Sequence, residues 1–307
     1  MRGENMIEKV AAVVVTYNRR DCLLRCIQAL KMQIYDNFDI LIIDNNSTDG
    51  TRESIDEFIK NGDVKYCNTG ANLGGAGGFN YGMNCAVQAG YSHLWIMDDD
   101  CLPEPDALDS LARADEELEG NYGFLSSVAY WRDGSLCNMN IQKTGLKTKI
   151  EDYGSAKVPV IMATFVSAFF SADVVKKYGL PIKEFFIWSD DLEYTRRISK
   201  DMPCYVIPSS RVLHDMKSND KVNIATDSAD RLPRYAYLYR NEVYVYRREG
   251  FNGILYLFAR VCFHILKALR AKDNKMRRVG TIIKSFNSGW SFRPKIEYPT
   301  QNPAKED

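Results

Sequence analysis

The alternation of apolar runs with helix-like stretches over residues 1–100 constrains the fold more than any other feature of the sequence. KVAAVVVTYN, at residues 9–18, is a β-branched run that ends in polar residues, as a fully buried parallel strand does. Comparable runs lie at residues 38–44, 64–68 and 92–100. Strands that alternate with helices form a parallel sheet with helices on both faces. The sequence therefore predicts an α/β fold with a mainly parallel sheet flanked by helices.

The remaining elements are expected to be less regular. Helices are expected at residues 21–33 and 47–60, after a glycine-rich turn at 73–78, from about Asp190, and over most of the chain beyond Arg231. Further strands are expected within residues 122–131, 158–172 and 203–216.

Three of the first four strands end in polar residues. The polar triplets are Thr16-Tyr17-Asn18, Asp44-Asn45-Asn46 and Asp98-Asp99-Asp100. Ligands of open α/β sheets bind outside the carboxyl ends of the strands. The sequence therefore predicts that these residues gather along one edge of the sheet and form a binding site there.

The acidic triplet has a functional and a structural interpretation. Adjacent carboxylates repel one another, and a divalent cation such as Mg²⁺ or Mn²⁺ would neutralise them. If the chain stays extended, Asp98 and Asp100 point to the same side and could share one metal, while Asp99 points elsewhere. Alternatively, the triplet is a solvated acidic turn before a helix that begins near Pro103.

Two other segments, at Asp44 and at the glycine run, indicate a function less specifically. Asp44 could accept a hydrogen bond from a nucleobase imide, or it could be an ordinary turn residue. The run Gly74-Gly75-Ala76-Gly77-Gly78 would let the backbone approach a ligand. It lacks the Lys-Ser/Thr of a P-loop and follows the third strand, so by itself it is a weak signal.

Composition excludes some classes and favours others. Forty basic residues balance forty acidic ones, so no general attraction for nucleic acid is expected. Eight cysteines show neither CxxC pairs nor metal-ligand spacing, and we interpret them as reduced thiols of a cytoplasmic protein. No signal peptide is visible, and no segment reaches the roughly 18 uncharged apolar residues typical of a membrane span.

Six motifs in a fixed order resemble those of family 2 glycosyltransferases, which have the Rossmann-like GT-A fold. The motifs are VVVTYNRRDCLLRCIQAL, ILIIDNNSTDGT, NTGANLGGAGGFNYGM, WIMDDDCLPEPDAL, FFIWSDDLEYTRRI and VLHDM, and they cover residues 8–216. The FFIWSDDLEY and GGAGGFN versions are most similar to bacterial galactofuranosyl- and rhamnosyl-transferases, which build cell-wall, capsule or O-antigen glycans.

The resemblance implies a role for individual residues of this chain. The nucleotide sugar would be bound by Thr16, Tyr17, Asn18, Asp44, Asn72, Gly74, Gly75, Asp98 and Asp99, and Mn²⁺ or Mg²⁺ would be held by Asp98, Asp100 and His214. Asp191 would be the catalytic base of an inverting reaction. Asp190 and Glu193 would orient that base or contact acceptor hydroxyls, and Trp188 could stack on an acceptor sugar.

Each of these assignments has a structural alternative. Acidic residues such as Asp190 and Asp191 also stabilise the first turn of a helix. Trp188 could belong to the core, which is the commoner place for such a side chain. Of the three histidines, His93 is expected to be structural and His264 exposed, which leaves His214 as the candidate ligand.

The C-terminal third carries a charge asymmetry that the totals hide. Residues 260–278 contain seven Lys/Arg and one Asp. Apolar residues recur at three- and four-residue steps, at Phe251, Leu255, Phe258, Cys262, Ile265 and Leu269. A basic amphipathic helix of this kind could lie on an anionic membrane, or it could pack on the catalytic domain. The first alternative predicts a cytoplasmic enzyme bound peripherally to the inner face of the cell membrane.

The leading hypothesis is an inverting, metal-dependent glycosyltransferase. Its catalytic domain is expected at residues 1–230, with the donor half at about 1–105 and the acceptor half at about 106–230; residues 231–307 form a helical region.

UDP-galactofuranose is the first choice of donor and dTDP-rhamnose the second, with UDP-galactose and UDP-glucose still open. The acceptor would be a glycan or a polyprenyl-diphosphate-linked glycan. A nucleotidyltransferase fits less well, because TYNRRDC after the first strand contains no glycine. A non-catalytic sugar-binding protein is the third alternative.

Overall fold

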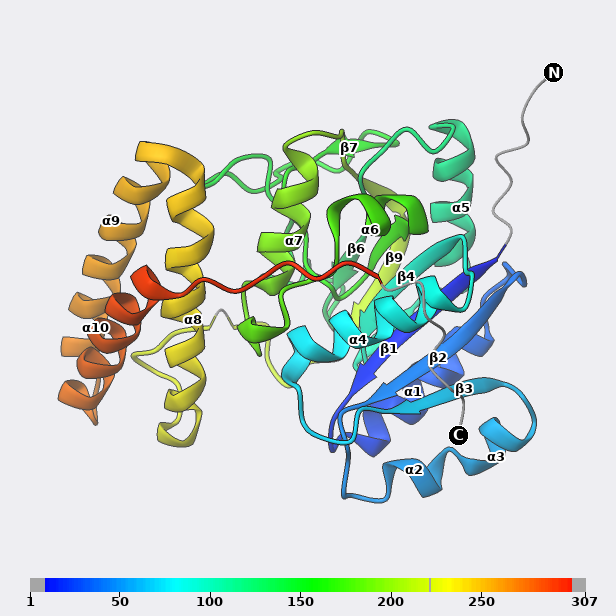
Figure 1. The fold of residues 1–307 in the computed structure, drawn as a ribbon, viewed down its shortest axis with the longest axis horizontal. Helices are drawn as coiled ribbons and strands as arrows, with labels where there is room; N and C mark the ends of the chain where they lie inside the picture. Colours follow the sequence, from blue (N-terminus) through cyan, green and yellow to red (C-terminus); the bar gives the residue numbers. More distant parts are fainter. Residues whose placement is uncertain (1–8, 221, 300–307) are drawn as a thin grey trace.

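Strand β1 (Val10–Thr16) lies inside a nine-stranded sheet that forms the centre of the molecule (Figure 1). This computed structural model describes residues 9–220 and 222–299. The strand order is β3-β2-β1-β4-β8-β6-β9-β5, and β7 pairs with β9. The first four strands in the chain are β1, β2 (Phe38–Asp44), β3 (Val64–Asn68) and β4 (His93–Asp98), and they pair in parallel. The predicted mainly parallel sheet of the first half is confirmed.

Both faces of β1 are buried, which explains its continuous apolar sequence. Val13 and its neighbours of the same parity pack against helix α4 (Gly74–Gln88). Val14 and its neighbours of the same parity pack against α1 (Arg20–Lys31) and α5 (Ala107–Glu117). Successive strand side chains point to opposite faces, so one uncharged run supplies both apolar layers.

The second half extends the sheet with antiparallel and parallel pairs. The strands are β5 (Cys101–Pro103), β6 (Leu125–Tyr130), β7 (Val158–Pro159), β8 (Ala168–Ser171) and β9 (Tyr205–His214). Strand β8 runs antiparallel to β4 and β6, whereas β6 and β9 are parallel. The helices of this half are α6 (Ala172–Tyr178), the 3-10 turn η1 (Lys183–Phe185) and α7 (Asp190–Ser199).

The run at residues 158–172 contains strands, as expected, one at each end; its middle packs on α7, where Ala163 N donates to Thr195 Oγ1 at 3.2 Å. Two other local expectations are wrong. The helix expected up to residue 60 is divided at Ile55 into α2 (Thr51–Ser54) and α3 (Asp56–Lys60). The glycine run is not a turn before a helix, because α4 begins at Gly74 and contains all four glycines.

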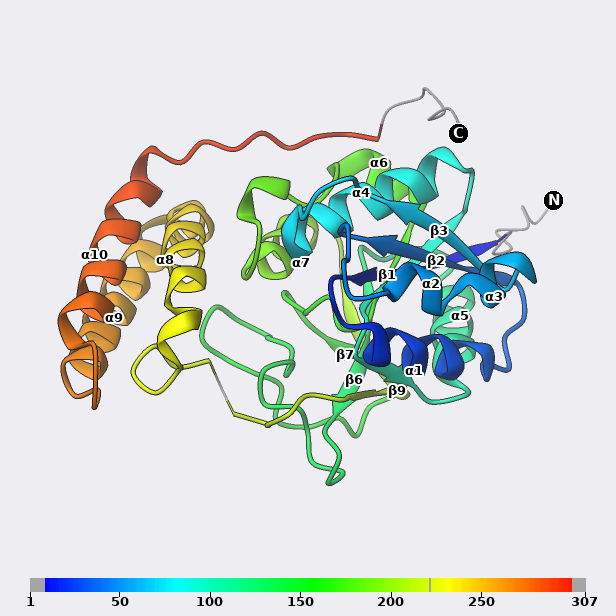
Figure 2. The same ribbon diagram turned by 90° about the horizontal axis from the view of Figure 1, so that it is seen from below.

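A three-helix unit follows the sheet and lies beside it (Figures 1 and 2). It contains α8 (Leu232–Tyr246), α9 (Gly250–Leu269) and α10 (Lys275–Ser291), with 3-10 turns η2 (Ala229–Arg231) and η3 (Arg247–Glu249). The unit has its own apolar core, which includes Tyr235, Val243 and Ile282. Residues 292–299 then run back, extended, to the part of the chain that contains the sheet, where Leu180 N donates to Glu297 O at 2.7 Å (Figure 2).

Helix α9 presents an apolar face to solvent. Its exposed apolar side chains are Phe251, Leu255, Phe258, Phe263, Leu266 and Leu269. The helical stretch Ala229–Leu269 includes an 18-residue window that is apolar enough to cross a membrane by length and composition. No such segment was predicted from the sequence, because the prediction considered only runs without a charged residue. His264 is not exposed as predicted: it is half-buried, and its Nδ1 lies 2.9 Å from the Tyr239 hydroxyl.

Candidate active site

The polar ends of β1, β2 and β4 lie side by side, as predicted. Thr16 pairs in register with Asp44, and Val15 pairs with Asp98. Because the three strands are parallel, their carboxyl ends meet at one edge of the sheet. The acidic triplet and the first two polar triplets therefore line a common edge.

Asp98, Asp100 and His214 form a cluster that could hold a metal ion. One ligand atom of each lies within 4.8 Å of the others. Asp98 ends β4 and is half-buried, whereas Asp100 lies in the turn between β4 and β5 and is buried. His214 comes from a distant part of the chain, because β9 pairs antiparallel with β5 and places His214 opposite Cys101.

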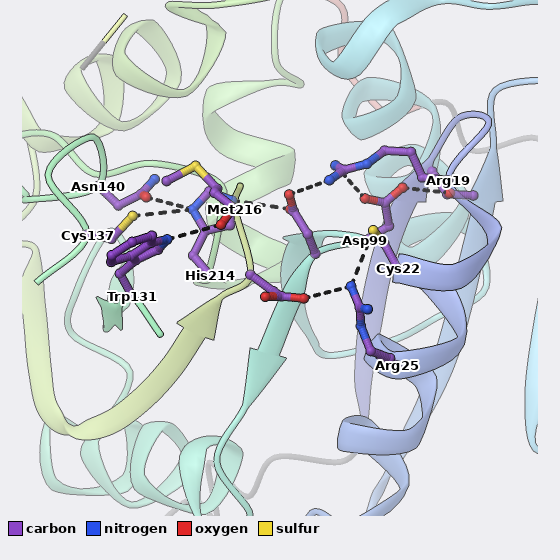
Figure 3. A network of polar contacts seen from close by, with 12 residues as sticks. Arg19, Cys22, Arg25, Asp99, Trp131, Cys137, Asn140, His214 and Met216 are labelled. Atoms are coloured by element: carbon purple, nitrogen blue, oxygen red, sulfur yellow. Dashed lines mark hydrogen bonds and ion pairs between the residues drawn. The ribbon is translucent and has the colours of Figure 1, made fainter. Parts of the chain in front are cut away.

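The surroundings of His214 prepare one ring nitrogen for ligation (Figure 3). Its Nδ1 lies 2.8 Å from Asn140 Oδ1, and the Asn140 amide nitrogen donates to Thr164 Oγ1, which fixes the orientation of the amide. Since an amide oxygen only accepts, Nδ1 carries the proton and Nε2 faces Asp100. A ligating histidine is typically oriented in this way through its other nitrogen.

Two cations balance the acidic triplet in this structure. Arg19 bridges it, with Nη1 2.8 Å from Asp99 Oδ1 and Nη2 2.7 Å from Asp100 Oδ2 (Figure 3). His214 Nε2 lies 3.2 Å from Asp100 Oδ1, a buried oxygen that accepts no hydrogen bond from any described residue. Two carboxylates and an imidazole are a donor set that fits Mn²⁺ or Mg²⁺, and Asp100 Oδ1, which among the described residues has only its ion pair with His214, could bind the metal.

Burial and the mutual repulsion of the carboxylates shift their pKa values. Burial, together with the neighbouring Asp100, raises the pKa of Asp98, and burial raises the pKa of Asp99 to about 7. Burial alone would also raise the pKa of Asp100, but its bonds to His214 and Arg19 hold it well below its usual range. Burial opposes protonation of His214, yet its contacts with Asp100 and Cys137 raise its pKa to about 10. The three neighbouring carboxylates therefore repel one another, and a bound divalent cation would reduce that repulsion.

Some residues predicted to bind the nucleotide are buried and hydrogen-bonded to neighbouring residues, whereas others are accessible. Asp44 is fully buried, and its two oxygens accept from the Tyr66 hydroxyl and from Ser47 N, each at 2.8 Å. Thr16 donates to Asp99 Oδ2 at 2.7 Å. By contrast, the Tyr17 ring is exposed at the end of β1.

Asn18, Asn72 and Gly74 shape the loops around that edge. Asn18 Oδ1 accepts from Thr48 N at 2.7 Å, which joins the ends of β1 and β2. Asn72 Oδ1 accepts from Gly74 N at 2.9 Å, just before α4. Gly74 packs closely against Phe186, whereas a Cβ at Gly75 would have no neighbour within 4 Å.

Asp190 and Asp191 form the first turn of α7, where the helix dipole favours carboxylates. Asp190 is buried and Asp191 half-buried. Burial raises the pKa of Asp191 to about 6, and burial and Asp191 raise that of Asp190 further. Both carboxylates act electrostatically on the metal cluster through Asp98. The structure therefore places a group suited to proton transfer near the acidic triplet but on a separate element.

Glu193 and Trp188 contact residues that were not predicted from the sequence as their partners. Glu193 Oε2 pairs with Arg197 Nη2 at 2.9 Å, and among the described residues no hydrogen bond or ion pair joins Glu193 to Asp191. Trp188 is half-buried and packs edge-on against Tyr235 of α8, at 5.1 Å between ring centroids.

Several residues of the site could not be found from motifs. They are Arg19, Tyr66, Cys137 and Asn140. Arg19 directly follows the TYN triplet, and this position was the available signal. Cys137 and Asn140 come from the irregular segment after β6, in which no motif was recognised.

Comparison with known proteins gives a family match and two sets of relatives. A family model described as Glycosyl transferase family 2 matches residues 11–179. Galactofuranosyltransferase GlfT1 of Mycolicibacterium smegmatis is 25% identical over 262 residues, which is 81% of this chain and 86% of that protein. A β-1,3-glucosyltransferase of Campylobacter jejuni, named for a PP-undecaprenol substrate, is 28% identical over 179 residues, 58% of this chain and 54% of that protein.

Solved structures share the fold. Staphylococcus aureus TarS (residues 1–349) superposes with a TM-score of 0.56 at 14% identity, covering 92% of this chain and 72% of that one. Mannosyltransferase PcManGT of Pyrobaculum calidifontis, solved with GDP-Man and Mn²⁺, has a TM-score of 0.55 at 17% identity, covering 92% of this chain and 75% of that one. The family match spans more than half of the chain, and the motif order, the sheet and the carboxylate edge agree with it. This chain belongs to glycosyl transferase family 2, and it is an enzyme that transfers a sugar from a nucleotide-sugar donor.

Proposed function

We propose that this enzyme is an inverting galactofuranosyltransferase that uses UDP-galactofuranose. The observation that supports an inverting mechanism is that Asp191, in the first turn of α7, lies close enough to act electrostatically on Asp98 of the cluster formed by Asp98, Asp100 and His214. A single displacement needs one base, unlike the two carboxylates of a glycoside hydrolase. Similarity to GlfT1 over 81% of the chain supports galactofuranose as the sugar.

A bound Mn²⁺ or Mg²⁺ would be held by Asp98, Asp100 and His214, and it would offset the charge that grows on the leaving diphosphate. Asn140 keeps the His214 ring in the orientation needed for this. Arg19 now neutralises Asp99 and Asp100, and its half-exposed side chain would be free to turn toward the donor phosphates.

Asp191 would perform the proton transfer. The acceptor hydroxyl attacks the anomeric carbon from the face opposite the diphosphate, and Asp191 takes its proton as the new glycosidic bond forms. The bond from the anomeric carbon to the diphosphate oxygen breaks in the same step, so the configuration inverts. A positioned base of this kind contributes about 10²–10⁴-fold to the rate. Asp190 and the helix N-terminus would hold Asp191 in place.

A donor panel with product analysis tests this proposal. The panel contains UDP-galactofuranose, dTDP-rhamnose, UDP-galactose and UDP-glucose, each with Mn²⁺ or Mg²⁺. We expect turnover with UDP-galactofuranose and a product of inverted configuration. Turnover with dTDP-rhamnose alone would instead favour the rhamnosyltransferase alternative, and a product of retained configuration would contradict the single displacement. Family membership favours a transferase over a nucleotidyltransferase, which would release pyrophosphate from a nucleoside triphosphate, and over a non-catalytic sugar-binding protein.

The Asp191→Asn variant tests the base separately. The substitution keeps the shape of the side chain and removes its basicity. We expect kcat to fall about 10²–10⁴-fold while UDP affinity, measured by calorimetry, stays within about two-fold. Unchanged turnover would remove Asp191 from the mechanism.

We further propose that the enzyme works at the cytoplasmic face of the membrane on a glycan carried by polyprenyl diphosphate. The support is the exposed apolar face of α9, where Phe251 is 79% and Leu255 58% exposed, followed by the basic segment at residues 267–278. An apolar helix face beside lysines and arginines suits an anionic lipid surface. The lipid-linked substrate named for the Campylobacter jejuni relative agrees with such an acceptor.

Vesicle flotation tests the membrane proposal. The protein should float with vesicles that contain phosphatidylglycerol, less with phosphatidylcholine alone, and less at high salt. The double variant Phe263→Asp/Leu266→Asp should lose flotation, and Asn252→Asp at an exposed polar position of the same helix is the matched control. If the double variant instead abolished self-association, the face would be an interface between two copies. Resistance to a carbonate wash would indicate a spanning helix.

A further inference from the structure

The segment that leads into α7 has an unusual backbone. Phe186, Trp188 and Ser189 all have positive φ, at 63°, 65° and 68°. Non-glycine residues rarely adopt this region, and they remain in it only when surrounding contacts hold them there. Asp190 and Asp191 follow directly, so whatever holds this segment also sets the position of the two carboxylates.

Asn241 of α8 holds the segment from one side. Its side chain is fully buried, and Nδ2 donates to Phe185 O at 3.0 Å and to Trp188 O at 2.9 Å. Ile187 O lies 3.3 Å from the same nitrogen. The side-chain amide of Asn241 therefore holds backbone carbonyls on both sides of the strained turn.

Arg240, the preceding residue, fixes the direction of that amide. Its Nη2 donates to Asn241 Oδ1 at 2.9 Å and to Glu184 O at 2.5 Å. With Oδ1 occupied by the guanidinium, Nδ2 is directed at the segment. Together, Arg240 and Asn241 form hydrogen bonds with backbone carbonyls between residues 184 and 188.

The first turn of α4 holds the segment from the other side. Ala76 N donates to Phe186 O at 3.2 Å. A Cβ at Gly74 would lie 2.1 Å from Phe186 O, so only glycine permits this approach. The segment is therefore clamped between the glycine-rich helix of the donor side and the C-terminal helical unit.

We infer that Asn241 is a positioning residue for the reaction: it holds the strained backbone of residues 185–189 so that Asp191 faces the acceptor hydroxyl. The C-terminal helices are then part of the active-site construction and not only an attachment. This inference rests on the proposed role of Asp191 as the base. In the described part of the chain, the Asn241 amide bonds only to residues 185–188 and Arg240, and not to Asp98, Asp100 or His214.

The test compares Asn241→Ala with a matched variant of the same helix. Tyr239→Phe removes a buried hydroxyl that contacts His264 within the helical unit and does not touch residues 185–189. For Asn241→Ala we expect kcat to fall at least ten-fold, while the donor KM and the UDP affinity stay within about two-fold. Tyr239→Phe should leave kcat within about two-fold.

The split between kcat and KM separates positioning from general damage. If Asn241→Ala keeps kcat within two-fold of wild type, or if kcat and UDP affinity fall together, the inference is overturned. Should Asn241→Ala fail to fold, Asn241→Ser, whose hydroxyl can still donate one bond, decides by the same criteria. Loss of turnover in Asp191→Asn with normal kcat in the Asn241 variants overturns this inference alone, whereas normal turnover in Asp191→Asn overturns the proposed base and this inference together.

Discussion

His214 shows how much of the chemistry of this site depends on single contacts. Its Nε2 faces Asp100, while Nδ1 is held by Asn140 Oδ1 at 2.8 Å. Asn140 in turn is oriented by Thr164. A side chain outside the candidate ligand set therefore determines which nitrogen is available to a metal.

Removing that contact should weaken the metal site without removing a ligand. Asn140→Leu removes the amide acceptor and leaves His214 Nδ1 only its contact with Cys137 Sγ at 3.7 Å, so metal affinity should fall about 10–100-fold. The measurement is the Mn²⁺ dependence of turnover at saturating donor. Asn138→Ala, on the same segment but bonded to Asn219, is the control and should leave the Mn²⁺ dependence unchanged. Equal Mn²⁺ dependence in both variants would show that Asn140 does not prepare His214 for metal binding.

The acid side of the pH–rate profile should report Asp191. Burial raises its pKa to about 6, and the charged groups that act on it or are acted on by it are Asp190, Asp98 and Lys143. A base works only as the carboxylate, so kcat should be level above pH 6 and fall about ten-fold per pH unit below it. The profile should be measured with Mn²⁺ saturating at every pH. A kcat that is constant from pH 5 to pH 8 would exclude Asp191.

Helix α4 shows at the scale of an element why a glycine-rich run can be structural. A Cβ at Gly78 would lie 2.5 Å from Val15 Cγ1, and one at Gly82 would lie 2.6 Å from Val13 Cγ1. The glycines therefore let α4 approach β1 more closely than larger residues would permit. That approach brings the first turn of α4 up to the segment that leads into α7.

Two substitutions in this helix should have opposite effects on stability. Gly78→Ala forces the new methyl into Val15, and the free energy of unfolding should fall by about 1–3 kcal/mol. Gly75→Ala places the methyl in open space, and the helix should gain about 0.5–1 kcal/mol. Urea denaturation of both variants checks this. Equal effects would mean that α4 and β1 are not in close contact in solution.

At the scale of the whole molecule, the C-terminal helices and the catalytic sheet are joined at several places. Residues 292–299 cross from α10 to the catalytic part, where Glu297 pairs with Lys183 and binds Asn80 (Figure 2). Phe292 packs against Phe185 and Tyr244. The catalytic part and the helical unit should therefore unfold together.

Loss of one apolar contact in this connection should be measurable. Ile296 packs in the small cluster formed by Ala76, Ile182 and Phe185, so Ile296→Ala should lower the free energy of unfolding by about 1–3 kcal/mol. Lys295→Ala, at an exposed neighbouring position, is the control and should change it by less than about 0.5 kcal/mol. The measurement is chemical denaturation followed by fluorescence. No difference between the variants would show that residues 292–299 do not bind the catalytic part.

The local features of this protein could be predicted from its sequence because their causes are local. The uncharged run at β1, the polar strand ends and the helical spacing of α1 and α9 each reflect the immediate surroundings of the residues concerned. Parallel pairing followed from the alternation of strands and helices, and it was enough to place Thr16, Asp44 and Asp98 on one edge.

What only the tertiary structure decided are the contacts between segments far apart in the chain. Cys101 meets His214, Asn140 meets His214, and Asn241 meets Trp188. The motif order named His214 as a ligand, but no periodicity or motif encodes its contact with Asn140 or that of Asn241 with Trp188, because each depends on how whole elements pack against one another. The sequence by itself determined the parallel sheet edge, its carboxylates and the candidate His214, whereas packing decided which distant side chains orient that histidine and hold the segment before Asp190 and Asp191.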